Sequence, residues 1–303
     1  MQPKRIKKNI DGIFLLDKPI GYSSNQALQK VKWLFKAVKA GHTGTLDPLA
    51  TGLLPICFGE ATKFAQYVTD ADKTYIATVK FGQTTTTGDA EGEVLTQAPV
   101  NFDLETLKMT CQNFVGEITQ IPPMHSALKF EGKALYEYAR DGVEIERQAR
   151  KVTIYNIFVE SFCEEVAILS VTCSKGTYIR TLAEDIGHAL GCGAHLIGLR
   201  RTETAGFKIS DAITLEQLIE KSEQNASLEN FLQPVDAAIL NFPAIQLDKN
   251  AAFRLTQGQV VKMSDKNIQT MVGEVRAYDE DNRFLGLCQC EQGKLMPKRL
   301  IKI

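Results

Sequence analysis

A strictly alternating segment, Lys73–Gly82, is the feature that most constrains the fold of this chain. Every second residue from Tyr75 to Phe81 is apolar and shares one face of a strand, while Thr74 to Lys80 occupy the other face. Two further strands, Val152–Phe162 and Val166–Cys173, flank a turn and predict an antiparallel hairpin. Helical patterns are interspersed with the strands, without a strict βαβ rhythm. The chain therefore predicts an α+β fold with a mixed, largely antiparallel central sheet flanked by helices.

Periodicity and capping residues place the other elements. Ser23 or Ser24 can cap a helix whose Leu28, Val31, Phe35 and Val38 fall on one face. The remaining expectations are a buried strand at Gly12–Leu16, a helix at Glu60–Val68, a helix marked by Leu104, Leu107 and Cys111, a strand at Gly116–Ile121, a helix after Gly176-Thr177 with Ile179, Leu182 and Ile186 on one side, and a strand at Leu196–Phe207.

A change of composition around Asn241–Asp248 divides the chain in two. A length of 303 residues suits about two domains of ~100–200 residues. We expect one domain over residues 1–247 and a small, β-rich domain over residues 248–303. Hydrophobic residues make up 44% of the chain and charged residues 23%, so it can build a core and is not a disordered chain.

Cysteine usage and the lack of long apolar runs bear on the compartment. The run Ile13–Leu16 is too short for the core of a signal peptide, and no stretch approaches the ~18 uncharged residues of a membrane helix. Seven cysteines without paired spacing favour free, mostly buried thiols. We expect a cytoplasmic protein that does not associate with membranes.

The net charge of −1 conceals an uneven distribution of charge. Residues 1–40 carry nine basic and two acidic residues, residues 214–236 carry one basic and five acidic residues, and residues 248–303 have a net charge of +3. Such a separation can give a neutral protein one positive face, suited to a nucleic acid. The alternative is that these lysines only solvate a helix and a terminal segment.

Motifs for cofactor chemistry are missing from the sequence. It contains neither GxxxxGK[ST] nor GxGxxG, no GxSxG, and no His, Cys and carboxylate set with metal-ligand spacing. We therefore expect no cofactor and no metal.

Asp47 stands out in the segment Gly41–Gly59, which we expect to be a loop with short strand pieces. Pro48 disfavours helical geometry at Asp47, and Gly44 and Gly52 allow another backbone to approach closely. A carboxylate on a stiffened loop is well placed to meet a ligand. The alternative is an ordinary Asp-Pro turn.

Arg180 is the second candidate, because a cation in the first turn of a helix is unfavourable without compensation. The compensating carboxylate is either Glu184, one turn along, or a residue from elsewhere. Tyr75 on its strand is a core residue by default. Asp89, Glu91 and Glu93 lie in a glycine-flanked turn and are expected to be solvated.

Several segments resemble one family in chain order: Gly12–Pro19 with Gly21–Ser24, Gly41–Gly52, Lys73–Tyr75, Ile121–Lys129, Gly176–Arg180 and Leu199–Arg201. On these motifs the chain is similar, over nearly its whole length, to the bacterial TruB-type tRNA pseudouridine synthases. That family acts on the uridine at position 55 of the T loop. The C-terminal segment is similar to the family's small, PUA-like RNA-binding domain.

The resemblance implies a role for each matching residue. Asp47 would be the nucleophile, Arg180 its ion-pair partner and Tyr75 the residue stacked on the target base. Further contacts to substrate are implied for His42, Leu199, Tyr178, Lys18 and Lys73. Residues 121–150 would form an RNA-clamping insertion. The implied partner is the T stem-loop of tRNA, bound by a monomer that needs no protein partner.

Two other functions stay open at this point. A non-catalytic protein could bind the T arm and only reshape it, using the same basic and aromatic surface. A hydrolase could cut a glycosidic bond with Asp47, although no partner carboxylate accompanies this residue in the sequence.

Overall fold

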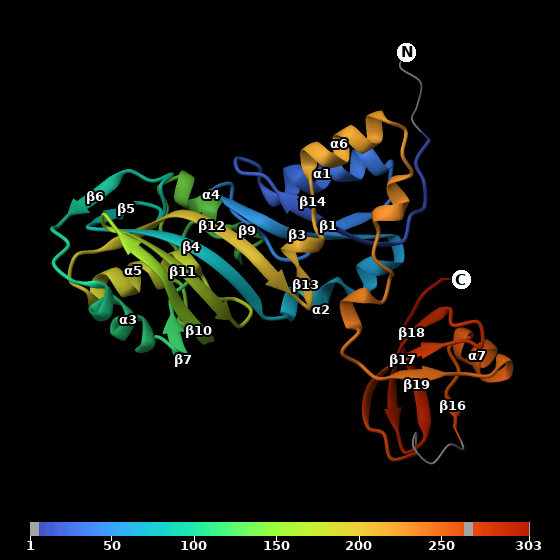
Figure 1. The fold of residues 1–303 in the computed structure, drawn as a ribbon. Coiled ribbons are helices and arrows are strands. Elements are labelled where there is room, and N and C mark those ends of the chain that lie inside the picture. Colours follow the sequence, from blue (N-terminus) through green and yellow to red (C-terminus); the bar gives the residue numbers. More distant parts are fainter. Residues whose placement is uncertain (1–5, 264–268, 303) are drawn as a thin grey trace.

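A ten-stranded mixed sheet forms the centre of the structure, a computed structural model that describes residues 6–263 and 269–302 (Figure 1). Its main path is β14 (Ile213–Thr214), β1 (Gly12–Lys18), β3 (Ala50–Phe58), β12 (Ala194–Thr204), β4 (Lys73–Phe81), β11 (Val166–Cys173), β10 (Arg150–Cys163) and β7 (Gly116–Gln120). Two short strands lie off this path: β13 (Phe207–Lys208) pairs antiparallel with the end of β12, and β2 (Ala40–His42) pairs with β3. The pairs β1–β14 and β3–β12 are parallel, while the other described pairs of this sheet are antiparallel. The predicted fold class is confirmed.

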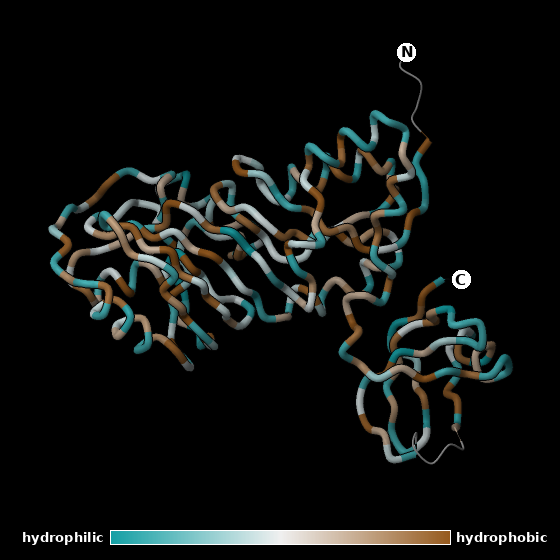
Figure 2. Tube along the Cα trace, in the orientation of Figure 1, coloured by the Kyte–Doolittle hydropathy of each residue, from teal (hydrophilic) through white to brown (hydrophobic). Residues whose placement is uncertain are grey.

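The alternating strand lies inside this sheet as predicted. Along β4 the odd positions from Lys73 to Phe81 are buried and the even positions are half-buried. The β10–β11 hairpin turns at Glu164 and Glu165, whose φ angles of 47° and 69° are typical of a tight hairpin turn. Figure 2 colours the same view by hydropathy and shows hydrophobic residues distributed along the strands of the sheet.

The first helix, α1 (Ser24–Phe35), begins at a capping box made by Ser23 and Gln26. Leu28, Val31 and Phe35 are buried as predicted. The prediction for Val38 was wrong, because the helix ends where Lys36 adopts a left-handed φ of 56°. Val38 therefore leaves the helical face and is 47% exposed.

Helices and short elements surround the sheet. They are η1 (Gly59–Phe64), α2 (Ala65–Asp70), α3 (Leu104–Gln112), α4 (Leu135–Arg140), α5 (Ile179–Ala189), η2 (Ile209–Asp211), α6 (Leu215–Glu223), η3 (Leu228–Phe231) and η4 (Ala237–Ile239), with the strand pairs β5 (Gln83–Thr85) with β6 (Val94–Gln97) and β8 (Lys129–Phe130) with β9 (Lys133–Ala134). α3 and α5 bury Leu107, Cys111 and Ile186 in the same core as Ala77 and Val79 of β4. This face of β4 also carries Tyr75.

The segment Gly41–Gly59 is more regular than predicted. Instead of short strand pieces, Ala50–Phe58 forms one nine-residue strand, β3, between β1 and β12. Pro55 is tolerated because β12 pairs with residues 50–52 and β2 with residues 56–58, so proline falls at the junction between these two partners. Its carbonyl accepts hydrogen bonds from the amide (3.1 Å) and hydroxyl (3.2 Å) of Thr43.

The C-terminal residues form a second, five-stranded sheet. Its order is β15 (Ala244–Gln246), β17 (Gly273–Tyr278), β18 (Phe284–Glu291), β19 (Lys294–Leu300) and β16 (Val261–Lys262), with α7 (Lys249–Thr256) beside it. The sheet encloses its own core around Leu255, Val275 and Leu295. Because β15 belongs to it, this sheet begins at residue 244, slightly before the division at residue 248.

The second unit packs against η1 and α2 of the first. The Tyr67 hydroxyl donates to Glu274 at 3.0 Å, and the Lys63 ammonium donates to the Leu300 carbonyl at 2.8 Å. Phe64 and Phe284 meet edge to face, with ring centroids 5.5 Å apart. Polar and aromatic contacts therefore join the two units.

Six of the seven cysteines are buried and Cys163 is exposed, which confirms the prediction of mostly buried thiols. Among the described residues, no helix is long and apolar enough to cross a membrane.

Candidate active site

A pocket of about 340 Å³ brings together most of the residues singled out by the sequence. Segments far apart in the chain line it: the loop before β3, the start of β4, the insertion, the start of α5 and β12. The predicted site residues in its wall are Asp47, Lys73, Tyr75, Tyr178, Arg180 and Leu199. A larger pocket of about 780 Å³ lies by η4 and contains neither Asp47 nor Arg180.

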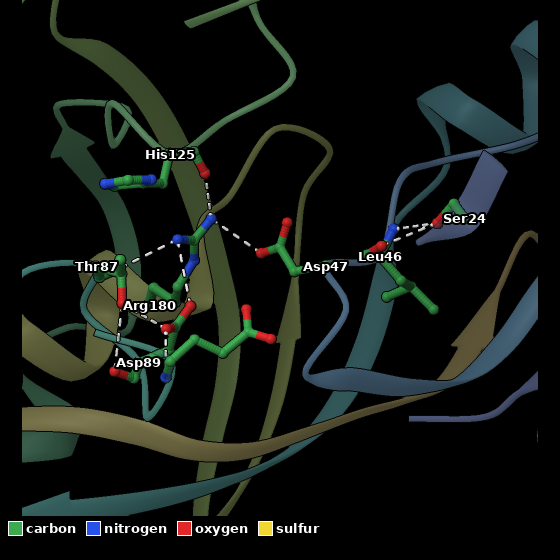
Figure 3. A network of polar contacts seen from close by, with 8 residues as sticks. Ser24, Leu46, Asp47, Thr87, Asp89, His125 and Arg180 are labelled. Atoms are coloured by element: carbon green, nitrogen blue, oxygen red, sulfur yellow. Dashed lines mark hydrogen bonds and ion pairs between the residues drawn. The ribbon is translucent and has the colours of Figure 1, made fainter. Parts of the chain in front are cut away.

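Short hydrogen bonds fix the loop that carries Asp47 (Figure 3). The buried Ser24 hydroxyl accepts from the Leu46 amide at 2.7 Å and donates to the Leu46 carbonyl at 3.0 Å. On the other side of Asp47, the Pro48 carbonyl accepts from the Gly21 amide at 2.8 Å. The first turn of α1 and the loop that precedes it therefore hold both neighbours of the carboxylate.

Gly44 in this loop and Gly52 near the start of β3 both lie close to Arg201, as the sequence predicted for a close approach. Gly44 and Gly52 have φ angles of 78° and 97°. A Cβ on Gly52 would lie 2.9 Å from the Arg201 amide nitrogen and would collide with its carbonyl. Only glycine fits this junction of β3 and β12 without displacing the backbone.

The Arg180 guanidinium binds two carboxylates and two carbonyls. Its Nη2 lies 2.9 Å from Asp47 Oδ2 and its Nη1 lies 3.4 Å from Asp89 Oδ2. Nη1 also donates to the Thr87 carbonyl at 3.1 Å, and Nη2 to the His125 carbonyl at 2.5 Å (Figure 3). Residues from elsewhere in the chain thus compensate the positive charge of Arg180 at the start of α5. Arg180 is 5% exposed.

Asp89 was wrongly expected to be solvated. It is 2% exposed, whereas its neighbours Glu91 and Glu93 are exposed as predicted. Its Oδ1 accepts from the Thr87 hydroxyl at 2.5 Å and from the Glu91 amide at 3.1 Å. The turn folds inward because Arg180 supplies a buried cation for this carboxylate.

Asp47 differs from Asp89 in its access to the pocket. About 40% of the Asp47 side chain is exposed, against 3% for Asp89. Burial raises the pKa of Asp47 above its ordinary 3.8, and the charge of Asp89 adds to this, while the Arg180 guanidinium opposes it. Asp47 is therefore the carboxylate that a ligand can reach.

Tyr75 lies opposite Arg201 on neighbouring strands and is 7% exposed. Burial raises the pKa of the Tyr75 hydroxyl, and the charge of Arg201 opposes that rise. Arg201 was not singled out by the sequence beyond its place in Leu199–Arg201.

Two of the predicted lysines are buried and donate to backbone carbonyls. Lys73 is 8% exposed and donates to the carbonyls of Thr69 (2.9 Å) and Ala71. Lys18 is fully buried, donates to the carbonyls of Pro19 (3.0 Å) and Tyr22 (2.5 Å), and does not line the pocket. Burial lowers the pKa of each lysine to about 8.

Tyr178 lines the pocket, whereas His42 does not. Tyr178, in the pocket wall, donates its amide to Gln120 at 3.0 Å, and the Arg150 guanidinium lies 4.8 Å from its ring centroid. His42 on β2 is outside the pocket wall, and its buried Nδ1 has no hydrogen-bond partner among residues 6–263 and 269–302. Burial and then Arg201 lower the pKa of His42.

The insertion predicted at residues 121–150 holds β8, β9 and α4 and is anchored to the pocket. The bond from Arg180 to the His125 carbonyl ties it to α5, and its residues Ser126 to Leu128 line the pocket. Within the insertion, the Ser126 carbonyl accepts from the Tyr136 amide at 3.1 Å. Cations lie over its aromatic rings, Lys133 at 4.7 Å from Tyr138 and Arg140 at 5.3 Å from the Tyr136 ring centroid. Such pairs suit stacking on bases beside phosphates.

The fold and this pocket define a class of protein. The structure resembles a solved Cbf5-Nop10-Gar1 complex with a TM-score of 0.72 at 25% identity, over 96% of this chain and 84% of that one. It also has the fold of a structure titled an H/ACA RNP bound to a substrate RNA containing 2′-deoxyuridine, with a TM-score of 0.71 at 22% identity over 100% of this chain and 92% of that one. The fold is that of the pseudouridine synthases.

Family comparisons narrow this class. The model described as TruB family pseudouridylate synthase (N-terminal domain) matches residues 32–179. Residues 180–240 match the tRNA pseudouridylate synthase B C-terminal domain, and residues 243–301 match the model described as Pseudouridine synthase II TruB, C-terminal. The chain is 57% identical to tRNA pseudouridine synthase B of Methylobacillus flagellatus, over 100% of this chain and 99% of the relative. The chain is 51% identical to tRNA pseudouridine synthase B of Ectopseudomonas mendocina, over 99% of this chain and 98% of the relative.

The chain belongs to the TruB family of pseudouridylate synthases, which confirms the resemblance of its motifs. The second sheet is the small β-rich, PUA-like unit that the resemblance implied.

Proposed function

We propose that this protein isomerises uridine to pseudouridine at position 55 in the T loop of tRNA, with Asp47 as the nucleophile. The observation that carries the proposal is the Asp47 carboxylate, held at 2.9 Å by Arg180 and open to a pocket that Tyr75 also lines. The names of the relatives support tRNA as the substrate.

The reaction breaks the bond between uracil N1 and ribose C1′, turns the base and joins C5 to the same carbon. Because substrate and product are isomers, no oxidant, reductant or phosphate donor is consumed. The base must first leave the stack, at a cost of a few kcal/mol. Stacking on an aromatic ring returns about 1–3 kcal/mol, a role that suits Tyr75.

Asp47 must be ionised to act as a nucleophile or to stabilise positive charge on the sugar. Arg180 favours the ionised form and aims one carboxylate oxygen. An ionised Asp47 serves each of three routes: attack at C1′, addition at C6, or a glycal intermediate.

Asp89 does not turn this site into that of a hydrolase. Activating water requires a second carboxylate that faces the substrate, and Asp89 is 2% exposed with both oxygens engaged. Asp89 therefore does not supply the water-activating carboxylate that a hydrolase needs beside Asp47.

The remaining roles implied by the resemblance belong to RNA binding. We assign the clamp to residues 121–150, together with the lysines of α1 and the unit beyond residue 247. We assign Leu199, Tyr178 and Lys73, which line the pocket, to the target nucleotide. We assign Lys18 and His42, which lie outside the pocket wall, to further contacts with the substrate RNA. We propose that the protein acts in the cytoplasm, as a monomer whose partner is the T stem-loop of tRNA.

Tritium release from tRNA labelled at uracil C5 tests this function, because C5 loses its hydrogen when it joins the ribose. We expect release with the wild type and a loss of at least about 1,000-fold with Asp47→Asn, which keeps the shape but not the charge. Equal release by both proteins would overturn the assignment of Asp47.

Two outcomes of this assay would identify the other functions. A protein that only reshapes the T arm would bind tRNA without releasing tritium from C5, and Asp47→Asn would change nothing. A hydrolase would liberate free uracil, which chromatography of the supernatant separates from tritiated water.

A further inference from the structure

Arg201 occupies an unusual position beneath the pocket. It lies on β12, it is 1% exposed, and it is among the largest fully buried side chains of the described residues. Its neighbour Arg200 is the ordinary case, because its guanidinium forms two hydrogen bonds with Asp17, at 3.0 Å and 2.6 Å, and is 42% exposed.

The Arg201 guanidinium holds both ends of the segment that carries Asp47. Its Nε donates to the Leu53 carbonyl at 2.7 Å and its Nη2 donates to the Gly44 carbonyl at 3.1 Å. Gly44 precedes Asp47 by three residues and Leu53 follows it by six. A Cβ on Gly44 would lie 3.1 Å from Arg201 Nη1, so the loop packs directly on this side chain.

Tyr75 lies beside the same side chain, and both residues line the pocket. Arg201 and Tyr75 are directly opposite on the antiparallel strands β12 and β4, where Cβ atoms are about 5 Å apart. Burial raises the pKa of the Tyr75 hydroxyl, and the charge of Arg201 opposes that rise. One side chain therefore joins the Asp47 loop to the ring beside it.

Stability alone is a poor reason for this arrangement. Within the described part of the chain, no carboxylate lies at ion-pair distance from Arg201, and the nearby Lys73 is also buried. A buried cation without a counter-ion is costly. The planar fork of arginine donates to the Leu53 and Gly44 carbonyls together while its charge lies beside Tyr75, a geometry that a lysine ammonium does not reproduce.

We propose that Arg201 is a positioning residue of the reaction, which locks the Asp47 loop and the Tyr75 hydroxyl into one geometry so that carboxylate and phenol meet the extruded nucleotide together. The inference rests on the proposed function, because it concerns the same pocket.

Arg201→Lys tests it, with Arg200→Lys as the matched control on the next residue. Both variants keep the charge and lose a forked guanidinium, so both lower Tm. We expect Arg201→Lys to reduce kcat for tritium release by about 100-fold, the usual effect of a 1 Å misplacement, with KM for tRNA within about threefold of wild type. Arg200→Lys keeps kcat within about threefold.

A double-mutant cycle with Tyr75→Phe separates positioning from mere support of the fold. If Arg201 acts through the Tyr75 hydroxyl, the double variant loses little more kcat than the worse single variant. Fully multiplicative losses would overturn the proposal, as would an Arg201→Lys protein with wild-type kcat, or one whose kcat falls only as much as that of Arg200→Lys.

Two further results keep the test decisive. Should Arg201→Lys fail to fold, Tyr75→Phe alone decides: a kcat at least about 10-fold lower at unchanged Tm supports the proposal, and a wild-type kcat overturns it. A wild-type protein that releases no tritium contradicts the proposed function itself, whereas an active wild type beside an active Arg201→Lys contradicts only the role of Arg201.

Discussion

At the scale of single residues, the pocket surrounds one accessible carboxylate with cations. Arg180 forms ion pairs with both Asp47 and Asp89. Lys73 and Arg201 also line the pocket, and they donate to backbone carbonyls. Burial alone would favour a protonated Asp47, and the charges of Arg180 and Lys18 oppose this. Asp47 is thus the carboxylate of this pair that is open to the pocket, and Arg180 favours its ionised form.

The pH dependence of the reaction reports this balance. Because the pKa of Asp47 is raised, kcat/KM falls as pH drops through a value above 3.8. Arg180→Gln removes the opposing cation, so the acid limb moves to higher pH. Single-turnover tritium release from about pH 4 to about pH 8 measures the shift. The control is Arg283→Gln, whose side chain is 68% exposed. An acid limb for Arg180→Gln at the wild-type pH or below would contradict this account.

At the scale of elements, the site depends on the junction of β3 and β12. The loop before β3 brings Asp47 to the pocket. The parallel pairing of Gly52 with Arg201 fixes the register of β3 against β12, and so the position of this loop along β12. Ser24, in the first turn of α1, fixes the other side of the same loop.

Gly52→Ala tests the junction, because an added Cβ would collide with the backbone of Arg201 at a φ of 97°. We expect a loss of about 2–4 kcal/mol in the free energy of unfolding, measured with urea. Gly41→Ala is the control, since nothing lies within 4 Å of the added carbon. Its effect should stay within about 0.5 kcal/mol. Equal stabilities of the two variants would contradict the close approach.

Local patterns were enough to predict β4, the β10–β11 hairpin and the glycines beside Asp47. These features depend on periodicity and on turn geometry, which neighbouring residues determine. Asp89 could not be predicted in this way, because its burial depends on Arg180, which is distant in the sequence.

β3 and Arg201 were missed for related reasons. Proline argues against a central strand in the sequence, so Pro55 concealed β3. Its lack of an amide hydrogen is tolerated because Pro55 falls between the residues that pair with β12 and those that pair with β2, an arrangement that depends on the tertiary fold. Arg201 follows Arg200 in the sequence, and only the sheet decides which of the two side chains is buried.

At the scale of the whole molecule, two units are joined by contacts of η1 and α2 with β17, β18 and the residues after β19. The net charge of −1 is distributed unevenly, with a basic excess in residues 1–40 and 248–303. A neutral protein of this kind can still bind a polyanion over one face.

Salt dependence tests that binding mode. Phosphate contacts release counterions, so Kd for tRNA should rise by at least about 100-fold between about 50 and about 200 mM KCl. Lys30→Gln on α1 should reduce the logarithmic slope by about one, while Lys108→Gln on α3 should leave it unchanged. A Kd that is insensitive to salt would contradict RNA binding through these lysines.

The central claim is tested most directly by locating the product in the RNA. Unmodified tRNA is incubated with wild type or with Asp47→Asn, and pseudouridine is mapped at nucleotide resolution by carbodiimide modification and primer extension. The account predicts one new pseudouridine, at position 55 of the T loop, with the wild type and none with Asp47→Asn. Pseudouridine at another position, or its formation by the variant, would contradict the account.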